Sequence, residues 1–478
     1  PVMPFPTPGV RFTVAQFEQF IGVRIPQPPS PEVQTAIDSM MGYRRSTSKK
    51  YMPWMRDFRH FCWLIADEGA TDVQTVVTPA LLHRYLRQRV ALRTKKPCPS
   101  TFYGATAGVT KLYDFQNIAG VNPNPHPRDR NVLAYIRTYG EAWLAKQREE
   151  DDEDHLAGTV AEGYDSTGEL QRMTDELFLE GSLDTDMQRH GVLLSHFGIL
   201  RNAEMRKLML ADCCVLKYGS STEPGTLDIP ILVLRIIDAK CNRTNQIEYA
   251  SMMRNRNIHI CPVLAFACTL FIRFQLLSFE SLPRFQETNW FKHRVVCEYE
   301  RPTTEYGTSK FNTKVKELQE AAGVVSEKAS HCFRQGGARH LENMNVDHAN
   351  IQRMGRWTQT MTSRKYLASV SKAAVKAHAG FESNERYDIQ RMGIVPPLEV
   401  LQLFFPELEE RELDFVQFAQ EANRRGDRRA VKVSSKAFLR LLHAMRVVLA
   451  QDLPLLYDHF RSKAPDRQHP MFAHPIFA

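Results

Sequence analysis

The sequence has no long apolar run and few cysteines, and both absences narrow the class of protein. No window approaches the roughly 18 consecutive apolar residues that a membrane-spanning helix needs, so we expect no membrane partner. The nine cysteines include no C-x-x-C pair, which argues against a zinc ribbon and against a disulfide framework. No internal repeat of solenoid period is found. The sequence is therefore expected to form ordinary globular domains without a cysteine-bound metal.

The residues that are present indicate a folded protein with an anionic partner. The 478 residues are 43% hydrophobic and 10% aromatic, which suffices for two or three domains with sizeable cores. Lysine plus arginine outnumber aspartate plus glutamate by 62 to 54, giving a formal net charge of +8. This excess favours a polyanionic partner.

The pattern of apolar residues predicts a mainly α fold with a small antiparallel β-sheet (α+β). Apolar residues recur every three or four positions through 31–148, as in helices that each bury one face. Residues 186–214 continue a helical pattern, whereas 226–240 and 246–254 alternate like two strands. We expect the apolar helix at 434–460 to lie in a core rather than on a dimer surface.

These patterns divide the chain into five expected parts. They are a proline-rich arm around one short helix (1–30), a helical domain (31–148), an acidic linker with the first helix of the next domain (149–187), a domain of helices and strands (188–380) and a C-terminal helical extension (381–478). The boundary at the acidic linker is marked by a run of acids with glycine, serine and threonine.

Basic residues with interleaved hydroxyls mark the surface of the helical domain. Cations and hydroxyls both donate to phosphate oxygens, so these residues are candidates for DNA contacts. For each patch alone, a solvated helix face is the simpler interpretation. The candidates are Arg44, Arg45, Lys49, Lys50, Arg93, Lys95, Lys96 and Lys111, together with Arg243 beyond this domain.

Six residues of the second half form a candidate catalytic set. His331 and Arg334 are three apart, so on a helix they project from one face. Arg201 begins a helical pattern, and Lys240 lies at the turn between the two strand-like runs. The set is Arg201, Lys240, His331, Arg334, Trp357 and Tyr366.

This set suits attack on a phosphodiester. An arginine fork binds phosphate oxygens in pairs and stays charged at any working pH. A tyrosine phenol, with a pKa near 10, becomes a nucleophile when nearby cations favour the phenolate. A lysine on a hairpin can protonate the leaving alkoxide. The expected chemistry needs no metal and no nucleotide cofactor, and a protein–tyrosine phosphodiester would conserve bond energy for strand exchange.

Each residue alone has an ordinary structural interpretation. Arg201 could pair with Glu204 or Asp212, His331 could cap a helix, Trp357 could anchor packing, and Tyr366 could be a surface aromatic. Only the order and spacing of all six residues together favour a catalytic function. Other basic residues are interpreted as phosphate-positioning or plain surface charge outside the active site; they include Arg339, Arg353, Arg356, Arg364, Lys365 and residues 424–429.

The order of the six residues resembles the tyrosine recombinase/integrase family, whose motif is Arg, Lys, His-x-x-Arg, His or Trp, Tyr. Glu204, three residues after Arg201, and the tripeptide GRW at 355–357 add to the resemblance. It implies a helical core-binding domain at 31–148 and a catalytic domain at 188–380 around double-stranded DNA. It also implies a 3′-phosphotyrosine intermediate, a homodimer or homotetramer on DNA, and no small-molecule substrate.

The flanks are similar to the recombinases of cryptons, which are eukaryotic mobile elements. This similarity lies in residues 239–274 and 372–410, and the stretch RTNQ leaves Arg243 as an alternative to Lys240. The same flanks resemble the DNA-binding domain of the budding-yeast centromere-binding kinetochore subunit, which shares the fold without the catalysis. We therefore expect a crypton-like recombinase or transposase of the nucleus. The alternatives are a catalytically silent centromere-type DNA-binding protein and a type IB topoisomerase.

Overall fold

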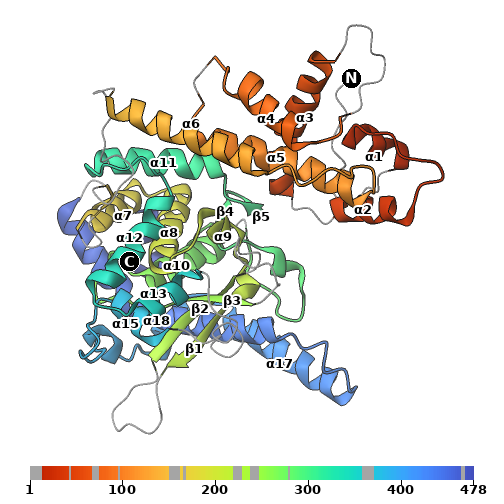
Figure 1. Cartoon of the computed structure of the whole chain (residues 1–478). Coiled ribbons are helices and arrows are strands. Elements are labelled where there is room, and N and C mark those ends of the chain that lie inside the picture. The colour runs from red at the N-terminus through yellow and green to blue at the C-terminus, as the bar shows by residue number, and fades with distance from the viewer. Residues whose placement is uncertain are drawn as a thin grey trace. The chain divides into compact units, whose positions relative to one another are not determined.

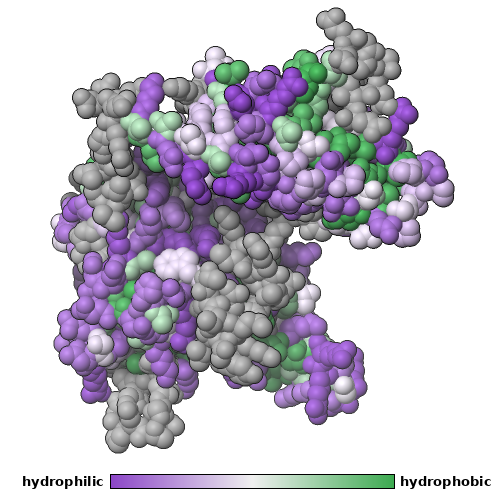
Figure 2. All heavy atoms as spheres, in the orientation of Figure 1, coloured by the Kyte–Doolittle hydropathy of each residue, from purple (hydrophilic) through white to green (hydrophobic). Residues whose placement is uncertain are grey.

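The computed structural model describes residues 13–41, 45–66, 75–94, 97–149, 162–164, 168–218, 229–236, 247–277, 280–357, 371–464 and 469–477. The chain divides into two compact units, residues 1–155 and 156–478. Apolar side chains gather in buried clusters within each unit, and hydrophilic side chains cover most of the described surface on the face shown in Figure 2. No helix among these residues is long and apolar enough to cross a membrane.

Unit 1 is helical around a central helix, α5. Its elements are α1 (Val14–Ile21), α2 (Pro31–Met41), α3 (Arg45–Leu64), α4 (Pro79–Tyr85), the π-turn η1 (Leu86–Val90), α5 (Pro99–Ile118) and α6 (Arg130–Glu149). Gly108 lets α3 approach α5, because a Cβ there would lie 2.5 Å from the Cβ of Trp54. The short helix expected within 1–30 is α1, and its Phe17 and Ile21 are buried in the same core.

Unit 2 combines many helices with two small sheets. Its helices are α7 (Gly168–Glu180), α8 (Leu183–Phe197), α9 (Asn202–Lys207), α10 (Pro262–Phe271), α11 (Thr308–Ala321), α12 (His331–Asn343), α13 (His348–Gly355), α15 (Lys372–His378), α16 (Leu398–Leu403), α17 (Leu408–Arg424) and α18 (Val433–Lys463). A short π-helix is η3 (Ile272–Leu276), and the 3-10 helices are η2 (Leu210–Asp212), η4 (Asn289–Lys292), η5 (Gln390–Gly393), η6 (Pro470–Ala473) and η7 (Pro475–Phe477). The strands are β1 (Cys213–Tyr218), β2 (Ile229–Ile236), β3 (Glu248–Met252), β4 (Cys297–Glu298) and β5 (Arg301–Glu305).

The main sheet is antiparallel, in the order β1-β2-β3 (Figure 1). Cys214 pairs with Val233, and Leu234 pairs with Ala250. The predicted fold class, mainly α with a small antiparallel sheet, is confirmed. The helical pattern predicted over 186–214 holds for α8, which ends at Phe197, and for α9, which follows Arg201; Ile199, with a φ of 46°, lies between them. It is wrong at its end, where Cys213 and Cys214 belong to β1. The residues beyond α9 and η2 form β1. The sequence did not predict this strand, because short apolar runs do not distinguish strand from helix by periodicity alone.

Both faces of β2 are buried, and this positions the segments that carry the candidate site. Alternate residues of a strand point to opposite faces. Leu232 and Leu234 join a large core that includes α10 and α18. Ile231 and Val233 pack into a second cluster that includes residues of α13 and α15. The sheet thus lies between α13 and α15 on one side and α10 and α18 on the other.

The core interpretation of the last long helix is confirmed. In α18, side chains such as Leu442 and Leu449 are fully buried and belong to the main core. The helix packs against β1 and α10. The C-terminal residues therefore complete the hydrophobic core of unit 2.

Candidate functional site

The candidate site begins where two helices start side by side. Arg201 is the N-cap of α9, as the sequence predicted, and His331 is the first residue of α12. The Asn202 side chain donates to the Ser330 hydroxyl at 3.0 Å, which ties the residue after Arg201 to the residue before His331. Residues 130 positions apart in the chain are thereby brought together at two adjoining helix starts.

One buried acid, Glu204, gathers three arginines. Its carboxylate lies 2.5 Å from Arg201, 3.4 Å from Arg356 and 3.9 Å from Arg334. Glu204 also accepts the backbone N–H of Arg201 at 3.0 Å. Burial alone would raise the pKa of this carboxyl, but Arg356 and Arg201 outweigh burial and hold the pKa below its usual value. The cluster therefore combines one carboxylate with three guanidinium cations.

Arg334 joins three parts of unit 2. Its buried guanidinium donates to the backbone carbonyls of Ile199, before α9, and Gly355, at the end of α13. It also lies over the ring of Trp357, at 5.2 Å from the centroid, a distance at which cation–π attraction is significant. The position of Arg334 is thus set by α12, by the loop before α9 and by the turn after α13.

His331 lies one helical turn before Arg334 and is exposed. Its pKa is lowered, first by partial burial and then by the positive charges of Arg334, Lys328 and Arg201. The imidazole is therefore neutral at pH 7, with one nitrogen able to accept a proton. Arg201 and Arg334 therefore both lie close enough to His331 for their charges to act on its imidazole.

The tripeptide at 355–357 makes a tight turn that brings Trp357 to the site. A Cβ on Gly355 would lie 2.8 Å from the Trp357 ring, and Arg356 has a φ of 53°. Trp357 packs against the hydrophobic cluster that contains Ile231 and Val233 of β2. The glycine is needed because any larger side chain would push the tryptophan away from Arg334.

The interpretation of Arg356 as surface charge or a phosphate contact is wrong. Its side chain is buried, and it donates to the carbonyls of Gly198, Ile199 and Met354 as well as to Glu204. Burial lowers the pKa of Arg356, but an arginine remains charged at neutral pH. Arg356 thus braces the loop before α9. Its place between Gly355 and Trp357 was the only sequence signal available.

Four members of the predicted catalytic set are described, and the structure brings them together: Arg201, His331, Arg334 and Trp357. Lys240, its alternative Arg243, and Tyr366 lie outside the described residues. On either side of Tyr366, the described residues end at Trp357 and resume at Ser371, whose hydroxyl donates to the side-chain oxygen of Asn350 of α13 at 2.9 Å.

The predicted DNA contacts of unit 1 are described only in part. Lys50 is exposed, Arg93 bonds to Asp57 at 3.1 Å and lies over the Trp54 ring, and Lys111 pairs with Asp114 at 2.6 Å. Arg44, Lys95 and Lys96 lie outside the described residues, as do the side chains of Arg45 and Lys49. A role for these residues in DNA binding stays a prediction.

Comparison with known proteins identifies one matching family. The family model described as "Centromere DNA-binding protein complex CBF3 subunit, domain 2" matches residues 111–478. Among curated proteins, no sequence is similar enough to count as a relative.

Several solved structures are similar at low identity. The XerH site-specific recombinase bound to its palindromic difH substrate is 12% identical, with 74% of this chain and 90% of that chain covered and a TM-score of 0.41. The Tn1549 transposon integrase with circular-intermediate DNA is 10% identical, with coverage of 72% and 97% and a TM-score of 0.40. Ndc10, a platform for inner kinetochore assembly in budding yeast, is 11% identical, with 92% of both chains covered and a TM-score of 0.36.

Proposed function

Because the chain belongs to the family described as the centromere DNA-binding protein complex CBF3 subunit, domain 2, we propose that it binds double-stranded DNA. We further propose that unit 2 cleaves and rejoins that DNA by the chemistry of a tyrosine recombinase. The finer proposal depends on the residues of the site. The family's described function supports only the DNA binding.

The observation that carries the proposal is the convergence of Arg201, His331, Arg334 and Trp357. Glu204 lies beside both arginines, Trp357 lies against Arg334, and the charges of both arginines act on His331. A motif that occurred by chance would give no reason for residues from α9, α12 and the turn after α13 to meet. Glu204 and the neighbouring carbonyls hold the guanidinium groups in fixed orientations. Preorganised donors of this kind stabilise the charge that develops on a phosphorane-like transition state.

In the proposed reaction, the phenol oxygen of Tyr366 attacks the phosphorus of a DNA phosphodiester. The bond from phosphorus to the 5′-oxygen breaks, which leaves a 3′-phosphotyrosine and a free 5′-hydroxyl. His331 takes the phenol proton, and Lys240 gives a proton to the departing oxygen, with Arg243 as the alternative donor. Arg201 and Arg334 hold the non-bridging oxygens, and the indole N–H of Trp357 donates to the same phosphate. Reversal of these steps rejoins a strand.

We propose a crypton-like mobile-element recombinase, acting in the nucleus as a homodimer or homotetramer on DNA. The support is the similarity of residues 239–274 and 372–410 to crypton recombinases. Within these flanks, Arg254 forms a buried ion pair with Asp452, and Tyr387 donates to the carbonyl of Arg254. Such contacts serve the fold, so the flanks alone do not separate an enzyme from a DNA-binding protein.

The test uses a nicked suicide duplex. A bound sequence is first selected from a random duplex library with the full chain, and a nick is then placed so that the cleaved end diffuses away. We expect an SDS-resistant protein–DNA adduct with the wild type and with the control Tyr299→Phe, whose tyrosine is exposed. The adduct should be absent in Tyr366→Phe. Persistence of the adduct in Tyr366→Phe would exclude this tyrosine as the nucleophile.

A second candidate function is a catalytically silent, centromere-type DNA-binding protein. It is favoured by the buried guanidinium of Arg334, which donates to two backbone carbonyls as a purely structural arginine would. Tight binding to the selected duplex without any adduct would support this function. Relaxation of unrelated supercoiled plasmids would instead indicate a type IB topoisomerase.

A further inference from the structure

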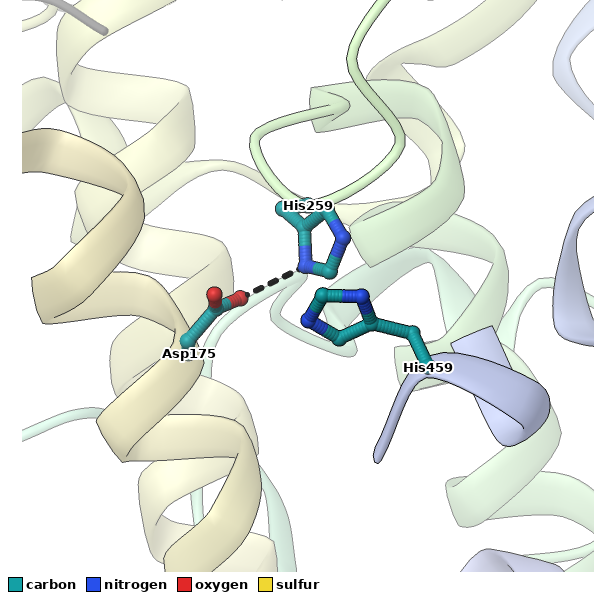
Figure 3. A group of neighbouring side chains, drawn as sticks. All are labelled: Asp175, His259 and His459. Carbon is teal, nitrogen blue, oxygen red and sulfur yellow. Dashed lines mark hydrogen bonds and ion pairs between the residues drawn. The ribbon is translucent and has the colours of Figure 1, made fainter. Parts of the chain in front are cut away.

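A second cluster of titratable side chains lies in unit 2 and shares no residue with the arginine site. Asp175 comes from α7, His259 from the turn between β3 and α10, and His459 from the end of α18. The three side chains point toward one another (Figure 3), and one possible ligand atom of each lies within 4.8 Å of those of the other two. Three separate segments of the chain therefore converge on one point.

The geometry is close to that of a metal centre. Asp175 Oδ1 and His259 Nδ1 are 2.8 Å apart, and the rings of His259 and His459 have centroids 4.1 Å apart. Zinc binds nitrogen at about 2.0–2.1 Å, so two ligand atoms on one tetrahedral ion lie about 3.4 Å apart. The acid–histidine pair would open by about 0.6 Å and the second ring would shift by no more than about 1.4 Å. Side-chain rotation can supply both movements.

The surroundings hold two of the ligands in place. The backbone N–H of His259 donates to Asn257 at 3.0 Å, and the carbonyl of His259 accepts from Arg189 at 2.9 Å. Asp175 accepts from Gln171 through its second oxygen, at 3.3 Å. These bonds leave the ring of His259 and one oxygen of Asp175 directed into the cluster.

His459 supplies an independent observation. Its Nε2 is buried and has no hydrogen-bond partner among the described residues. A buried polar atom without a partner costs free energy, and unsatisfied atoms of this kind call for an explanation such as a bound ion. A metal ion is the partner that two imidazoles and a carboxylate most readily share.

We propose that Asp175, His259 and His459 bind a divalent zinc ion, with water in the fourth position. Two histidines and a carboxylate form a known protein donor set for zinc, whereas calcium and magnesium prefer oxygen ligands only. Arg189 and Lys463 carry positive charge near the cluster. We therefore expect weaker binding than at a site with four thiolates.

The ion would fasten the end of α18 to α7 and to the turn before α10. The inference does not depend on the proposed DNA chemistry, because none of the three ligands takes part in it. Its expected consequence is a more stable attachment of the C-terminal helix to the rest of unit 2.

The experiment titrates chelator-treated full chain with Zn²⁺ against a chromophoric chelator. We expect one saturable equivalent in the wild type that is lost, or weakened by at least about ten-fold, in His459→Ala and in Asp175→Asn. The matched control is His443→Ala, which removes a partly exposed histidine from the same helix. It should bind like the wild type. Co²⁺ should give the visible absorption of a four-coordinate centre in the wild type and in the control.

A second readout is the effect of Zn²⁺ on the melting temperature. Zn²⁺ should raise the Tm of the wild type and of His443→Ala, and leave His459→Ala unchanged. Circular dichroism checks that each variant is folded. Equal zinc uptake by the wild type, His459→Ala and Asp175→Asn would overturn the proposal, and so would the absence of saturable uptake by folded wild type.

Discussion

At the scale of single residues, Glu204 is the side chain on which the arrangement of the site most depends. Replacing it by glutamine removes the one carboxylate shared by Arg201, Arg334 and Arg356. Removing one partner of a buried ion cluster leaves uncompensated charge, so we expect Glu204→Gln to lose about 3–5 kcal/mol of unfolding free energy. Urea denaturation measures this loss. The control Glu385→Gln, in an exposed pair with Arg256, should be indistinguishable from the wild type.

The same residue gives a pH dependence. The pKa of Glu204 is lower in the folded protein than its ordinary value of 4.5. The unfolded chain therefore binds the proton more readily, and the stabilisation is fully present above about pH 4.5 and is lost as the pH falls through the lower folded pKa. Denaturation curves of the wild type and of Glu204→Gln should converge as the pH falls below 4.5. A difference in stability that is constant down to pH 3 would contradict this.

Replacing Arg334 by lysine tests whether the position of its guanidinium group matters beyond its positive charge. A lysine keeps the charge but cannot donate to Ile199 and Gly355 at once while facing a phosphate. On the proposed function, Arg334→Lys should slow adduct formation by about 100-fold or more and change duplex affinity little. Quench-flow assays of the adduct and binding titrations measure the two effects. The control Arg339→Lys, on the same helix, should retain the rate, and equal slowing in both variants would argue against a catalytic role.

At the scale of elements, the close approach of α12 to α8 holds the His-x-x-Arg pair. A Cβ on Gly337 would lie 2.1 Å from the carbonyl oxygen of His196, a backbone atom that cannot rotate away. We expect Gly337→Ala to destabilise unit 2 by about 1–3 kcal/mol or more, because α12 must shift. Thermal and urea unfolding measure the loss. Gly393→Ala, with no atom within 4 Å of its added Cβ, is the control and should have no such effect.

The helices and strands that carry the site were largely predictable from local patterns, but the tertiary contacts between them were not. The three-residue spacing of His331 and Arg334 predicted one helix face, and α12 confirms it. The runs around β2 and β3 predicted two strands, whereas β1 was missed because its apolar residues continue the preceding helical pattern. Periodicity is a local property, so it does not show that the helical segments end at η2 and that a strand begins at Cys213.

At the scale of the whole molecule, long-range contacts define both clusters. The arginine site joins residues 201, 204, 334 and 356, and nothing in their spacing indicates that one buried acid serves three cations. Only the family resemblance gave a reason to group Arg201 with Arg334. The histidine cluster joins residues 175, 259 and 459, which have no metal-ligand spacing. Tertiary packing alone creates such sites.

Binding of duplex DNA should depend steeply on salt, because a protein with a net charge of +8 that neutralises phosphates releases their counterions. Each phosphate contact contributes about −0.9 to the slope of log K against log salt. If exposed Lys50 contacts a phosphate, Lys50→Gln should weaken binding about equally for all duplexes and reduce the slope by about 0.9. Fluorescence anisotropy over a series of salt concentrations measures this. Lys436→Gln, an exposed lysine on α18 outside the predicted contacts, is the control, and an unchanged slope in Lys50→Gln would remove this residue from the DNA interface.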